Sequence, residues 1–353
     1  MSATKKSSSA NTSKAMGEFD LIEHFFKEGA AKQGQDESVS LGIGDDCALL
    51  NINRNNHLAI STDMLVEGRH FLVGADPHWL GRKCLAVNLS DLAAMGAKPV
   101  GFTLAIAMPS VNAQWLAEFS KGLFEIAQEF NCRLIGGDTT AGPLTISITI
   151  FGEVPPSKAL KRNQAQVGDD IWVSHELGDA RLALGAIRHE WSLTESEMKS
   201  VSQRMHNPSP RVELGQALLD VAHSAIDVSD GLLGDLTHIL SQSNVCAEVA
   251  IDEVPASDVL KSKSIELRRL CTLMGGDDYE LCFTAPAENA EQIEKISIQL
   301  DIRLTRIGKI TSSKTTRDTS GNLAGVLRLL DQEGHELPPE LSSQYLKSFD
   351  HFK

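Results

Sequence analysis

Five short segments that combine carboxylates with small or polar residues constrain how this chain can fold. They are Gly44-Asp45-Asp46, Ser61-Thr62-Asp63, Asn88-Leu89-Ser90-Asp91, Gly136-Gly137-Asp138 and Asp227-Val228-Ser229-Asp230. Four of them follow apolar runs that predict strands, and the fifth lies within an apolar stretch that predicts a helix. An isolated ionised carboxylate is costly to bury, and a cluster is costlier because like charges repel. A fold that gathers these segments must therefore also supply partners that neutralise them.

Divalent cations are the natural partners of such a cluster. Mg²⁺ takes oxygen ligands, needs few carboxylates and completes its octahedron with substrate phosphates. Ser61, Thr62 and Ser229 offer further oxygen ligands, and the neighbouring glycines allow close backbone approach to phosphates. Any one segment alone is more simply interpreted as a turn or a helix cap. Five such segments together favour the metal-binding interpretation.

Asp91 is the most informative of the carboxylates. It lies in Ala86-Val87-Asn88-Leu89-Ser90-Asp91-Leu92-Ala93-Ala94-Met95, where Asn88 and Asp91 share one helix face and apolar residues cover the others. A carboxylate in this setting is expected to be partly buried and to need a partner. Arg82 or Lys98 could be that partner instead of a metal.

The length and the proline distribution predict two α+β domains. A chain of 353 residues exceeds the size at which a single core usually stops growing, roughly 250–300 residues. Pro155-Pro156 breaks both helix and strand and is the expected boundary between residues 17–154 and 155–353. Residues 1–16 are polar and predict a disordered tail, and residues 311–323 predict a mobile loop.

Hydrophobic periodicity places the expected elements along the chain. Helices are expected over 17–28, 78–97, 112–130, 178–190, 194–206 and 210–223. Strands are expected over 38–43, 58–61 (ending in Thr62-Asp63), 102–108, 133–135 (stopping at Gly136-Gly137-Asp138), 145–150, 171–174, 245–251 and 279–285. Residues 226–231 are expected to form a strand-to-helix turn.

Composition excludes several classes of function. The net charge of −14 argues against binding to nucleic-acid backbones, and no stretch approaches the roughly 20 apolar residues of a membrane helix. None of the six cysteines has CxxC spacing, which favours reduced core residues in a cytoplasmic protein. The chain has neither G-x-x-x-x-G-K-[ST] nor G-x-G-x-x-G after a strand. If ATP binds, several metal ions must hold it.

Longer blocks around the acidic segments resemble those of bacterial thiamine-monophosphate kinases. These blocks are Leu41–Leu50, Ile60–Asp63, Ala86–Ala97, Leu134–Thr140, Ala225–Gly231 and Gly275–Phe283, and the resemblance runs in order from about Gly17 to Phe352. The wider superfamily includes aminoimidazole-ribonucleotide synthetase and selenophosphate synthetase. The resemblance implies two α/β-type domains, with the N-terminal sheets of two subunits pairing into a β-barrel. It therefore implies a homodimer with active sites near the interface.

The resemblance also implies roles for individual residues, ATP as the phosphoryl donor, and thiamine monophosphate as the acceptor. Several Mg²⁺ ions are expected on Asp46, Ser61, Thr62, Asp63, Asp91, Asp138, Asp227 and Asp230. ATP contacts are expected from Gly137, Asp138, Arg162 and Ser229. The thiamine-phosphate site is expected to be lined by His70, Asp277 and Phe349. Asp277 stands where the family often has Glu, so its contact with substrate should be shifted or water-mediated.

A phosphate acceptor sets the expected mechanism. A phosphate monoester has a second pKa near roughly 6, so it is largely ionised at neutral pH and needs no general base. We therefore expect direct in-line transfer with no covalent nucleophile among the side chains.

Three other functions compete with a thiamine-phosphate kinase. Another ATP-using enzyme of the superfamily is the nearest. Residues 1–46 contain no cysteine, which disfavours selenophosphate synthetase, and Ser61–Gly68 departs from the segment usual in aminoimidazole-ribonucleotide synthetase. A non-catalytic nucleotide and cation sensor, and a structural cation-binding protein, are the other two.

Overall fold

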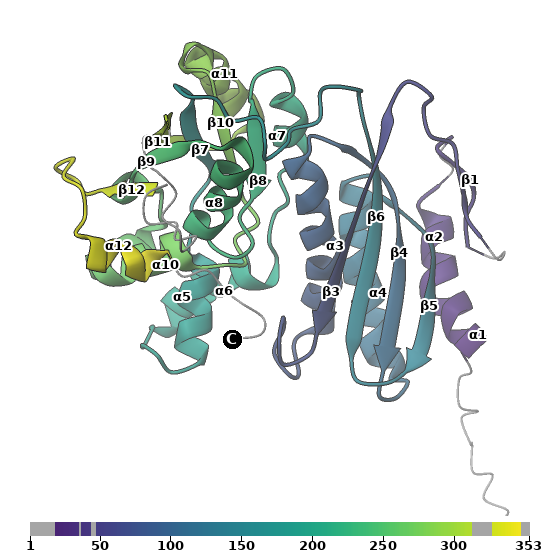
Figure 1. Cartoon of the computed structure of the whole chain (residues 1–353). Coiled ribbons are helices and arrows are strands. Elements are labelled where there is room, and N and C mark those ends of the chain that lie inside the picture. The colour runs from purple at the N-terminus through teal and green to yellow at the C-terminus, as the bar shows by residue number, and fades with distance from the viewer. Residues whose placement is uncertain (1–17, 35–36, 44–46, 313–326, 347–353) are drawn as a thin grey trace, which may run out of the picture.

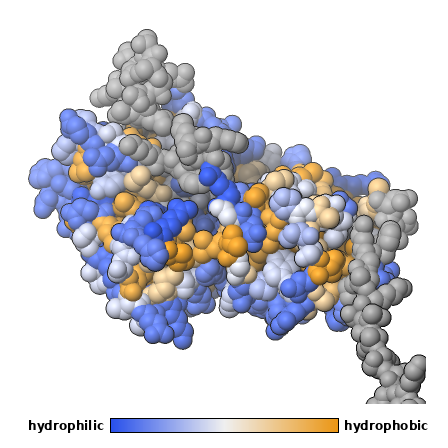
Figure 2. Space-filling model, turned by 90° about the horizontal axis from the view of Figure 1, so that it is seen from below, coloured by the Kyte–Doolittle hydropathy of each residue, from blue (hydrophilic) through white to orange (hydrophobic). Residues whose placement is uncertain are grey.

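The computed structural model describes residues 18–34, 37–43, 47–312 and 327–346. The chain forms two lobes, each with a β-sheet and helices packed on it, and α3 lies between the N-terminal sheet and the second lobe (Figure 1). Seen from below, the surface is mostly hydrophilic, and apolar residues appear in separate patches among the polar ones (Figure 2).

The N-terminal lobe is built on a four-stranded sheet in the order β3-β6-β4-β5. Its strands are β3 (His57–Val66), β4 (Lys98–Met108), β5 (Arg133–Ala141) and β6 (Thr145–Val154). β6 pairs antiparallel with both β3 and β4, and β5 runs parallel to β4 at the far edge. The strict alternation predicted for 145–150 is confirmed, because alternate residues of β6 from Ile146 to Val154 are buried.

The predictions that two strands end at acidic turns are wrong. β3 continues through Thr62-Asp63, because the apolar residues that follow pair fully with β6 as far as Val66–Thr145. β5 likewise continues through Gly136-Gly137-Asp138 to Ala141. Gly137 has φ +155° and lies so close to β4 that a Cβ atom would approach the Leu104 carbonyl oxygen to 1.9 Å. The glycine therefore allows two strands to approach closely and does not form a turn.

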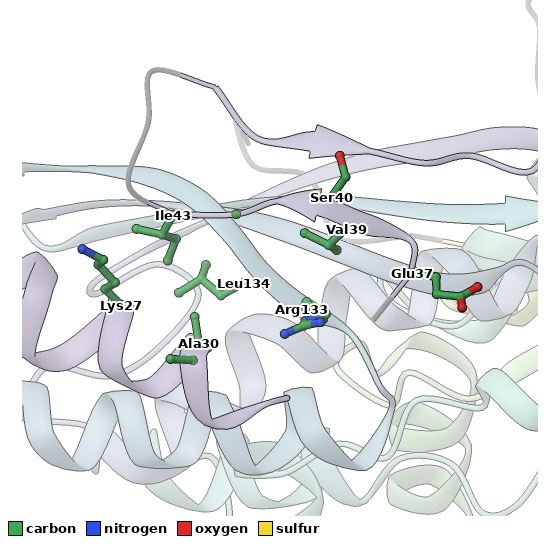
Figure 3. Close-up of a pocket in the computed structure, with 10 residues that line it drawn as sticks. Lys27, Ala30, Glu37, Val39, Ser40, Ile43, Arg133 and Leu134 are labelled. Carbon is green, nitrogen blue, oxygen red and sulfur yellow. The ribbon is translucent and has the colours of Figure 1, made fainter. Parts of the chain in front are cut away.

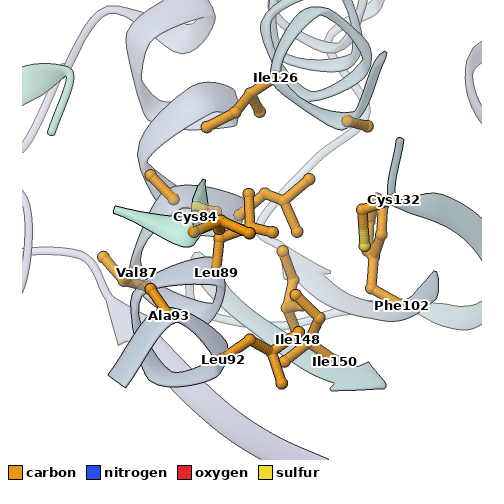
Figure 4. Close-up of a cluster of buried hydrophobic side chains, with 14 of the residues drawn as sticks. Cys84, Val87, Leu89, Leu92, Ala93, Phe102, Ile126, Cys132, Ile148 and Ile150 are labelled. Carbon is orange, nitrogen blue, oxygen red and sulfur yellow. The ribbon is translucent and has the colours of Figure 1, made fainter. Parts of the chain in front are cut away.

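Two helices cover one face of this sheet and form the main core. They are α3 (Pro77–Ala94) and α4 (Ala113–Glu129), and the side chains of Asp76 and Asn112 cap their N-termini. The 3.6-residue period predicted for 112–130 is confirmed by a stripe of buried residues on α4, including Leu116 and Leu123. α3 is buried on nearly all sides, and its Leu89 and Leu92 meet strand side chains in the cluster of Figure 4.

The N-terminal segment packs beside β5. α1 (Glu18–Leu21), a π-helix (Ile22–Lys27) and α2 (Glu28–Lys32) follow one another directly, so the helix predicted for 17–28 is confirmed and extends to Lys32. β1 (Val39–Leu41) and β2 (Leu49–Leu50) form a small antiparallel pair. The predicted strand at 38–43 thus exists but is shorter.

The C-terminal lobe is built on a six-stranded sheet in the order β12-β9-β11-β7-β10-β8. The strands are β7 (Asp170–Ser174), β8 (Ser224–Asp227), β9 (Cys246–Ala250), β10 (Leu281–Ala285), β11 (Leu304–Thr311) and β12 (Leu327–Leu330). The helices are α5 (Asp179–Ile187), α6 (Glu195–His206), α7 (Val212–Ala217), α8 (Leu232–Ser243), α9 (Asp258–Lys261), α10 (Ile265–Met274), α11 (Ala290–Leu300) and α12 (Pro339–Tyr345). Short 3₁₀ turns lie at Ile251–Glu253 and Ala287–Asn289. The helix predicted for 210–223 is shorter than expected, because turns at Leu218–Val221 end it.

The two sheets divide the chain close to the predicted boundary. β6 ends at Val154 and β7 begins at Asp170, so Pro155-Pro156 lies in the connection between the sheets. The division at residue 155 itself stays a prediction. The predicted tail at 1–16 and most of the predicted loop at 311–323 lie outside the described residues. Within the described ranges, no helix is both long and apolar enough to cross a membrane.

Candidate functional site

Four carboxylates from distant parts of the sequence gather where α3 meets β3 and the C-terminal lobe. Asp63 lies on β3, Asp91 on α3, Asp227 at the end of β8 and Asp230 in the turn before α8. Their charges act on one another, since Asp91 and Asp230 both raise the pKa of Asp63. We call Asp63, Asp91, Asp227 and Asp230 the acidic cluster.

Asp63 and Asp91 form the N-terminal half of the acidic cluster. The Ser61 hydroxyl donates a hydrogen bond to Asp91 Oδ2, and Asn88 Oδ1 accepts the backbone N–H of Asp63 at 3.2 Å. Burial, followed by the charges of Asp91 and Asp230, raises the pKa of Asp63 to about 6. Burial also raises the pKa of Asp91, although the Ser61 hydrogen bond and the charge of Arg162 oppose that rise.

Asp227 is the most buried carboxylate of the cluster. Ser90 on α3 donates a hydrogen bond to Asp227 Oδ2 at 2.8 Å, so the two lobes are joined at this point. Burial and the charge of Asp91 raise the pKa of Asp227 to about 7. β8 ends at Asp227 and α8 begins at Leu232, so the strand-to-helix turn predicted for 226–231 is confirmed.

Asp235 is a buried carboxylate of this region that the sequence interpretation missed. One of its oxygens accepts the backbone N–H groups of Ser229 and Asp230, at 3.0 and 3.1 Å. Burial raises the pKa of Asp235 to about 7. Its place in the first turn of α8, after Ser-Asp-Gly, is a helix-capping signal that could have identified it. Asp235 holds the turn that carries two of the predicted site residues.

The oxygen ligands of the acidic cluster are of the kind that a hard divalent cation takes, although no three of its four carboxylates have oxygens within 4.8 Å of one another. Among the described residues, none of the ion pairs involves Asp63, Asp91 or Asp227. Of the two cationic partners considered for Asp91, Arg82 pairs with Glu125 and Glu129 instead. Burial raises the pKa values of Asp63, Asp91 and Asp227, and repulsion from neighbouring carboxylates adds to the rise at Asp63 and Asp227. Such carboxylates gain most from a cation that binds oxygen. The structure thus supports a metal for Asp91 over Arg82.

Two predicted ligands, Thr62 and Asp138, stand apart from the acidic cluster. Side chains alternate along β3, so Thr62 is exposed on the opposite face from Ser61 and Asp63 and exchanges a hydrogen bond of 2.8 Å with Thr149. Asp138 lies on the far edge strand, and its neighbours across the sheet are Ala105, Ser147 and Met64. Three strand spacings of about 4.8 Å separate β3 from β5, or about 14 Å.

β5 borders a wide cavity on its other side. Lys27 and Ala30 of the N-terminal helices, Val39 and Ser40 of β1, and Leu134 of β5 surround it (Figure 3). It contains about 1190 Å³ of empty space, part of it open to solvent. A smaller, mainly apolar cavity with Gly137 and Asp138 on its wall shares Ile43 and Leu134 with it. The predicted ATP contacts on β5 are therefore accessible to a ligand.

His70 and Asp277, which are 207 positions apart in the sequence, line one pocket between the lobes. The pocket contains about 620 Å³ of empty space, again partly open to solvent, and Trp79, Leu184 and His206 also line it. His70 Nδ1 accepts the backbone N–H of Val66 at 3.0 Å, so the proton of the neutral ring lies on Nε2. We call this space the substrate pocket, because it is lined by two of the three residues expected to bind the thiamine phosphate.

Asp277 connects the substrate pocket with the acidic cluster. Lys83 Nζ donates to Asp277 Oδ2 at 3.0 Å, and the Tyr279 hydroxyl donates to Asp277 Oδ1 at 3.2 Å. Burial, followed by the charges of Asp277, Asp63 and Asp227, raises the pKa of Tyr279 well above its usual range. Tyr279 therefore stays protonated between the pocket and the cluster. Neither Lys83 nor Tyr279 was among the predicted site residues.

Comparisons with known proteins show the family to which this chain belongs. Residues 44–154 match the family AIR synthase related protein, N-terminal domain, and residues 166–319 match its C-terminal domain. The chain is 46% identical over 297 residues to thiamine-monophosphate kinase of Haemophilus influenzae, and the match covers 84% of this chain and 90% of the relative. The chain belongs to the thiamine-monophosphate kinase family. The predicted fold class and family are thereby confirmed.

Solved structures of thiamine-monophosphate kinases share the fold. The enzyme from Stenotrophomonas maltophilia K279a aligns with a TM-score of 0.80 at 41% identity, covering 92% of this chain and 99% of that one. AaThiL, solved in complex with AMPPCP and TMP, aligns with a TM-score of 0.70 at 26% identity, covering 96% of this chain and 97% of that one.

Of the remaining residues expected to bind ATP, metal or substrate, Arg162 and Ser229 lie among the described residues. Arg162 is exposed, and its charge acts on both Asp91 and Asp235. The Ser229 carbonyl accepts the backbone N–H of Asp277 at 2.9 Å. The segment expected to contact ATP is therefore in direct contact with the segment expected to bind thiamine phosphate. Asp46 and Phe349 lie outside the described residues.

Proposed function

We propose that this protein transfers the γ-phosphoryl group of ATP to thiamine monophosphate and forms thiamine diphosphate. The observation that carries the proposal is that the pocket residue Asp277 lies directly beside the turn that carries Asp227 and Asp230. The backbone N–H groups of Asp277 and Tyr279 donate to the carbonyls of Ser229 and Val228 at 2.9 and 2.8 Å. A phosphate-bearing acceptor in the pocket would place its phosphate beside carboxylates that need cations. The kinase family to which the chain belongs and the AaThiL complex with AMPPCP and TMP support this assignment.

The acidic cluster would hold several Mg²⁺ ions. In this proposal the ligands are Asp46, Ser61, Asp63, Asp91, Asp227 and Asp230 of one chain, together with Thr62 and Asp138. When bound, these ions neutralise the repulsion between the two phosphate groups and orient them. Ser61 and Ser90 fix the carboxylates of Asp91 and Asp227, so that the ligand oxygens are in place before the ions bind.

Direct in-line transfer needs no proton abstraction at this site. The acceptor phosphate is already largely ionised at neutral pH, so positioning and charge neutralisation supply the catalysis. Gly137, Asp138, Ser229 and the exposed guanidinium of Arg162 would contact ATP. His70, Asp277 and Phe349 would hold the thiamine phosphate. No side chain of the chain is assigned as a general base or covalent nucleophile.

We further propose that the protein is a homodimer formed through the outer face of the N-terminal sheet. Leu58, Ile60 and Met64 on β3 are exposed there, with Ile60 59% and Met64 57% accessible. Paired rows of small and apolar residues from β6 and β4 continue this face. Thr62 also lies on it, and Asp138 lies in the row with Met64 and Ser147. Pairing two copies would therefore bring these separated ligands to an interface.

The supporting evidence for a cytoplasmic location is the state of the cysteines. All six are free thiols, and five of them are buried. Such thiols suit a reducing compartment.

The first test is a transfer assay with ATP, Mg²⁺ and thiamine monophosphate, with products separated by chromatography. Equal amounts of thiamine diphosphate and ADP are expected. ADP with inorganic phosphate and no thiamine diphosphate would move the acceptor to another phosphorylated compound. Isolation of a phosphorylated protein intermediate would contradict direct transfer.

A further inference from the structure

Lys83 is a buried lysine that points into the substrate pocket. Its side chain is 6% exposed, and its ammonium group donates to the Met205 carbonyl at 2.9 Å and to Asp277 Oδ2 at 3.0 Å. A buried ammonium needs a charged partner, because removal from water is costly. The Asp277 side chain is less buried, at 34% exposed, and also lines the pocket.

Protein contacts hold both carboxylate oxygens and the backbone of Asp277. The Tyr279 hydroxyl donates to its second oxygen, and its backbone N–H donates to the Ser229 carbonyl. Its backbone has φ +69°, a left-handed conformation that is uncommon outside glycine and persists where surrounding contacts hold it. The carboxylate direction is therefore set by the protein before any ligand arrives.

α3 fixes how far this carboxylate lies from the acidic cluster. Lys83 and Ser90 are seven residues apart, so they lie on the same face of the helix, about 10 Å apart along its axis. Lys83 bonds Asp277, and Ser90 bonds Asp227. Through these two bonds, α3 joins the N-terminal lobe to Asp277 in the substrate pocket and to Asp227 in the acidic cluster.

We propose that Lys83 and Tyr279 are positioning residues that fix the Asp277 carboxylate for substrate, a role that rests on the proposed function of the pocket. The substrate class is a phosphate monoester whose other end is cationic, as in thiamine monophosphate. The fixed Asp277 carboxylate faces the cationic end, and the spacing set by α3 places the phosphate at the acidic cluster. Lys83 acts through Asp277 and makes no contact with the reacting atoms.

A double-mutant cycle tests this role. Lys83→Met and Asp277→Asn are each expected to raise the KM for thiamine monophosphate by on the order of tenfold, the cost of breaking a buried charge pair. The double variant should be no worse than Asp277→Asn alone. Lys83→Arg should recover part of the loss, and Tyr279→Phe should raise the same KM by less. The KM for ATP and the Mg²⁺ dependence should not change.

Lys261→Met is the matched control, since it removes an exposed Lys–Asp pair in the C-terminal lobe. The inference would be overturned if the KM increases of Lys83→Met and Asp277→Asn multiplied in the double variant. A loss confined to kcat or to thermal stability would also overturn it. If Lys83→Met does not fold, Tyr279→Phe with Asp277→Asn gives the same cycle. Calorimetry measures the affinity of each variant for thiamine monophosphate without turnover. The positioning role can therefore be tested even if the proposed kinase activity is not found.

Discussion

Ser90 on α3 donates a hydrogen bond to Asp227 at the end of β8, 137 positions away in the sequence, and this bond joins the two lobes beneath the acidic cluster. Both residues are buried, so water cannot replace the bond if it is lost. The same contact therefore supports the association of the lobes and the direction of a predicted metal ligand.

Ser90→Ala should lower the free energy of unfolding by about 1–3 kcal/mol, because it leaves a buried carboxylate oxygen without its donor. Urea unfolding measures the change. Ser343→Ala is a suitable control, since the Ser343 hydroxyl bonds an exposed carbonyl on α12 and its loss should cost at most about 0.5 kcal/mol. Equal effects of the two substitutions would show that the bond between the lobes contributes no special stability.

Asp227→Asn should stabilise the metal-free protein above neutral pH. The pKa of Asp227 is about 7 in the folded state, well above its value in the unfolded chain near 3.8. The folded state therefore favours the protonated carboxyl group. Its contribution to the free energy of unfolding is complete below about pH 4 and is lost as the pH rises to about 7. The advantage of Asn over Asp should therefore grow from roughly 1.6 kcal/mol near pH 5 to roughly 4 kcal/mol near pH 8, since one pKa unit is about 1.4 kcal/mol.

Unfolding of both proteins with a chelator across pH 5–8 measures this difference. Adding Mg²⁺ should stabilise the wild type more than Asp227→Asn, because cations neutralise the ionised cluster. A pH-independent difference between the two proteins would contradict the assigned burial of the Asp227 charge.

Asp91→Asn should abolish most of the turnover while leaving the protein folded. The substitution keeps the shape of the side chain but removes a charge that several metal ions would share, so kcat should fall by at least about 100-fold at limiting Mg²⁺. Steady-state assays over a Mg²⁺ titration measure the loss. Asp258→Asn, at a fully exposed carboxylate on α9, should behave as the wild type. Full activity of Asp91→Asn at low Mg²⁺ would refute its role as a ligand.

Asp235→Ala should raise the KM for ATP. Expressed as a free energy, this increase should exceed the loss in the free energy of unfolding. The carboxylate holds the backbone N–H groups of Ser229 and Asp230, and its loss frees the turn that carries both. Asp235→Asn keeps one acceptor oxygen and should retain most of the affinity. If both variants show the same KM as the wild type, the turn is held by other contacts.

Ile60→Lys should convert the proposed dimer into monomers. A lysine on the outer face of β3 would place one charge from each copy at the sheet-to-sheet interface, which is unfavourable when buried. Light scattering after size-exclusion chromatography measures the mass. Ile298→Lys on α11, at the more exposed of the two isoleucines, is the control and should leave the mass unchanged. A wild-type protein that elutes as a monomer would contradict the proposed interface.

The sequence by itself determined the family, the acidic segments proposed for the site and the helix that carries Asp91. The 3.6-residue period of α4 and the apolar surroundings of Asp91 are local properties, so they could be recognised without knowing any contact. The acidic segments were identified for the same reason, and the family blocks around them predicted the fold. Two of these segments were wrongly expected to end strands, because glycine and aspartate usually indicate turns. Ser61-Thr62-Asp63 lies within β3, and Gly136-Gly137-Asp138 lies within β5.

Only the tertiary structure decided how these residues combine. The two-residue period of a strand places Thr62 and Asp63 on opposite faces, and the strand order puts Asp138 on the far edge of the sheet. The bonds from Lys83 to Asp277 and from Ser90 to Asp227 join positions 194 and 137 apart. Such pairings depend on how the lobes dock, which is set by burial summed over many side chains and has no local signature in the sequence.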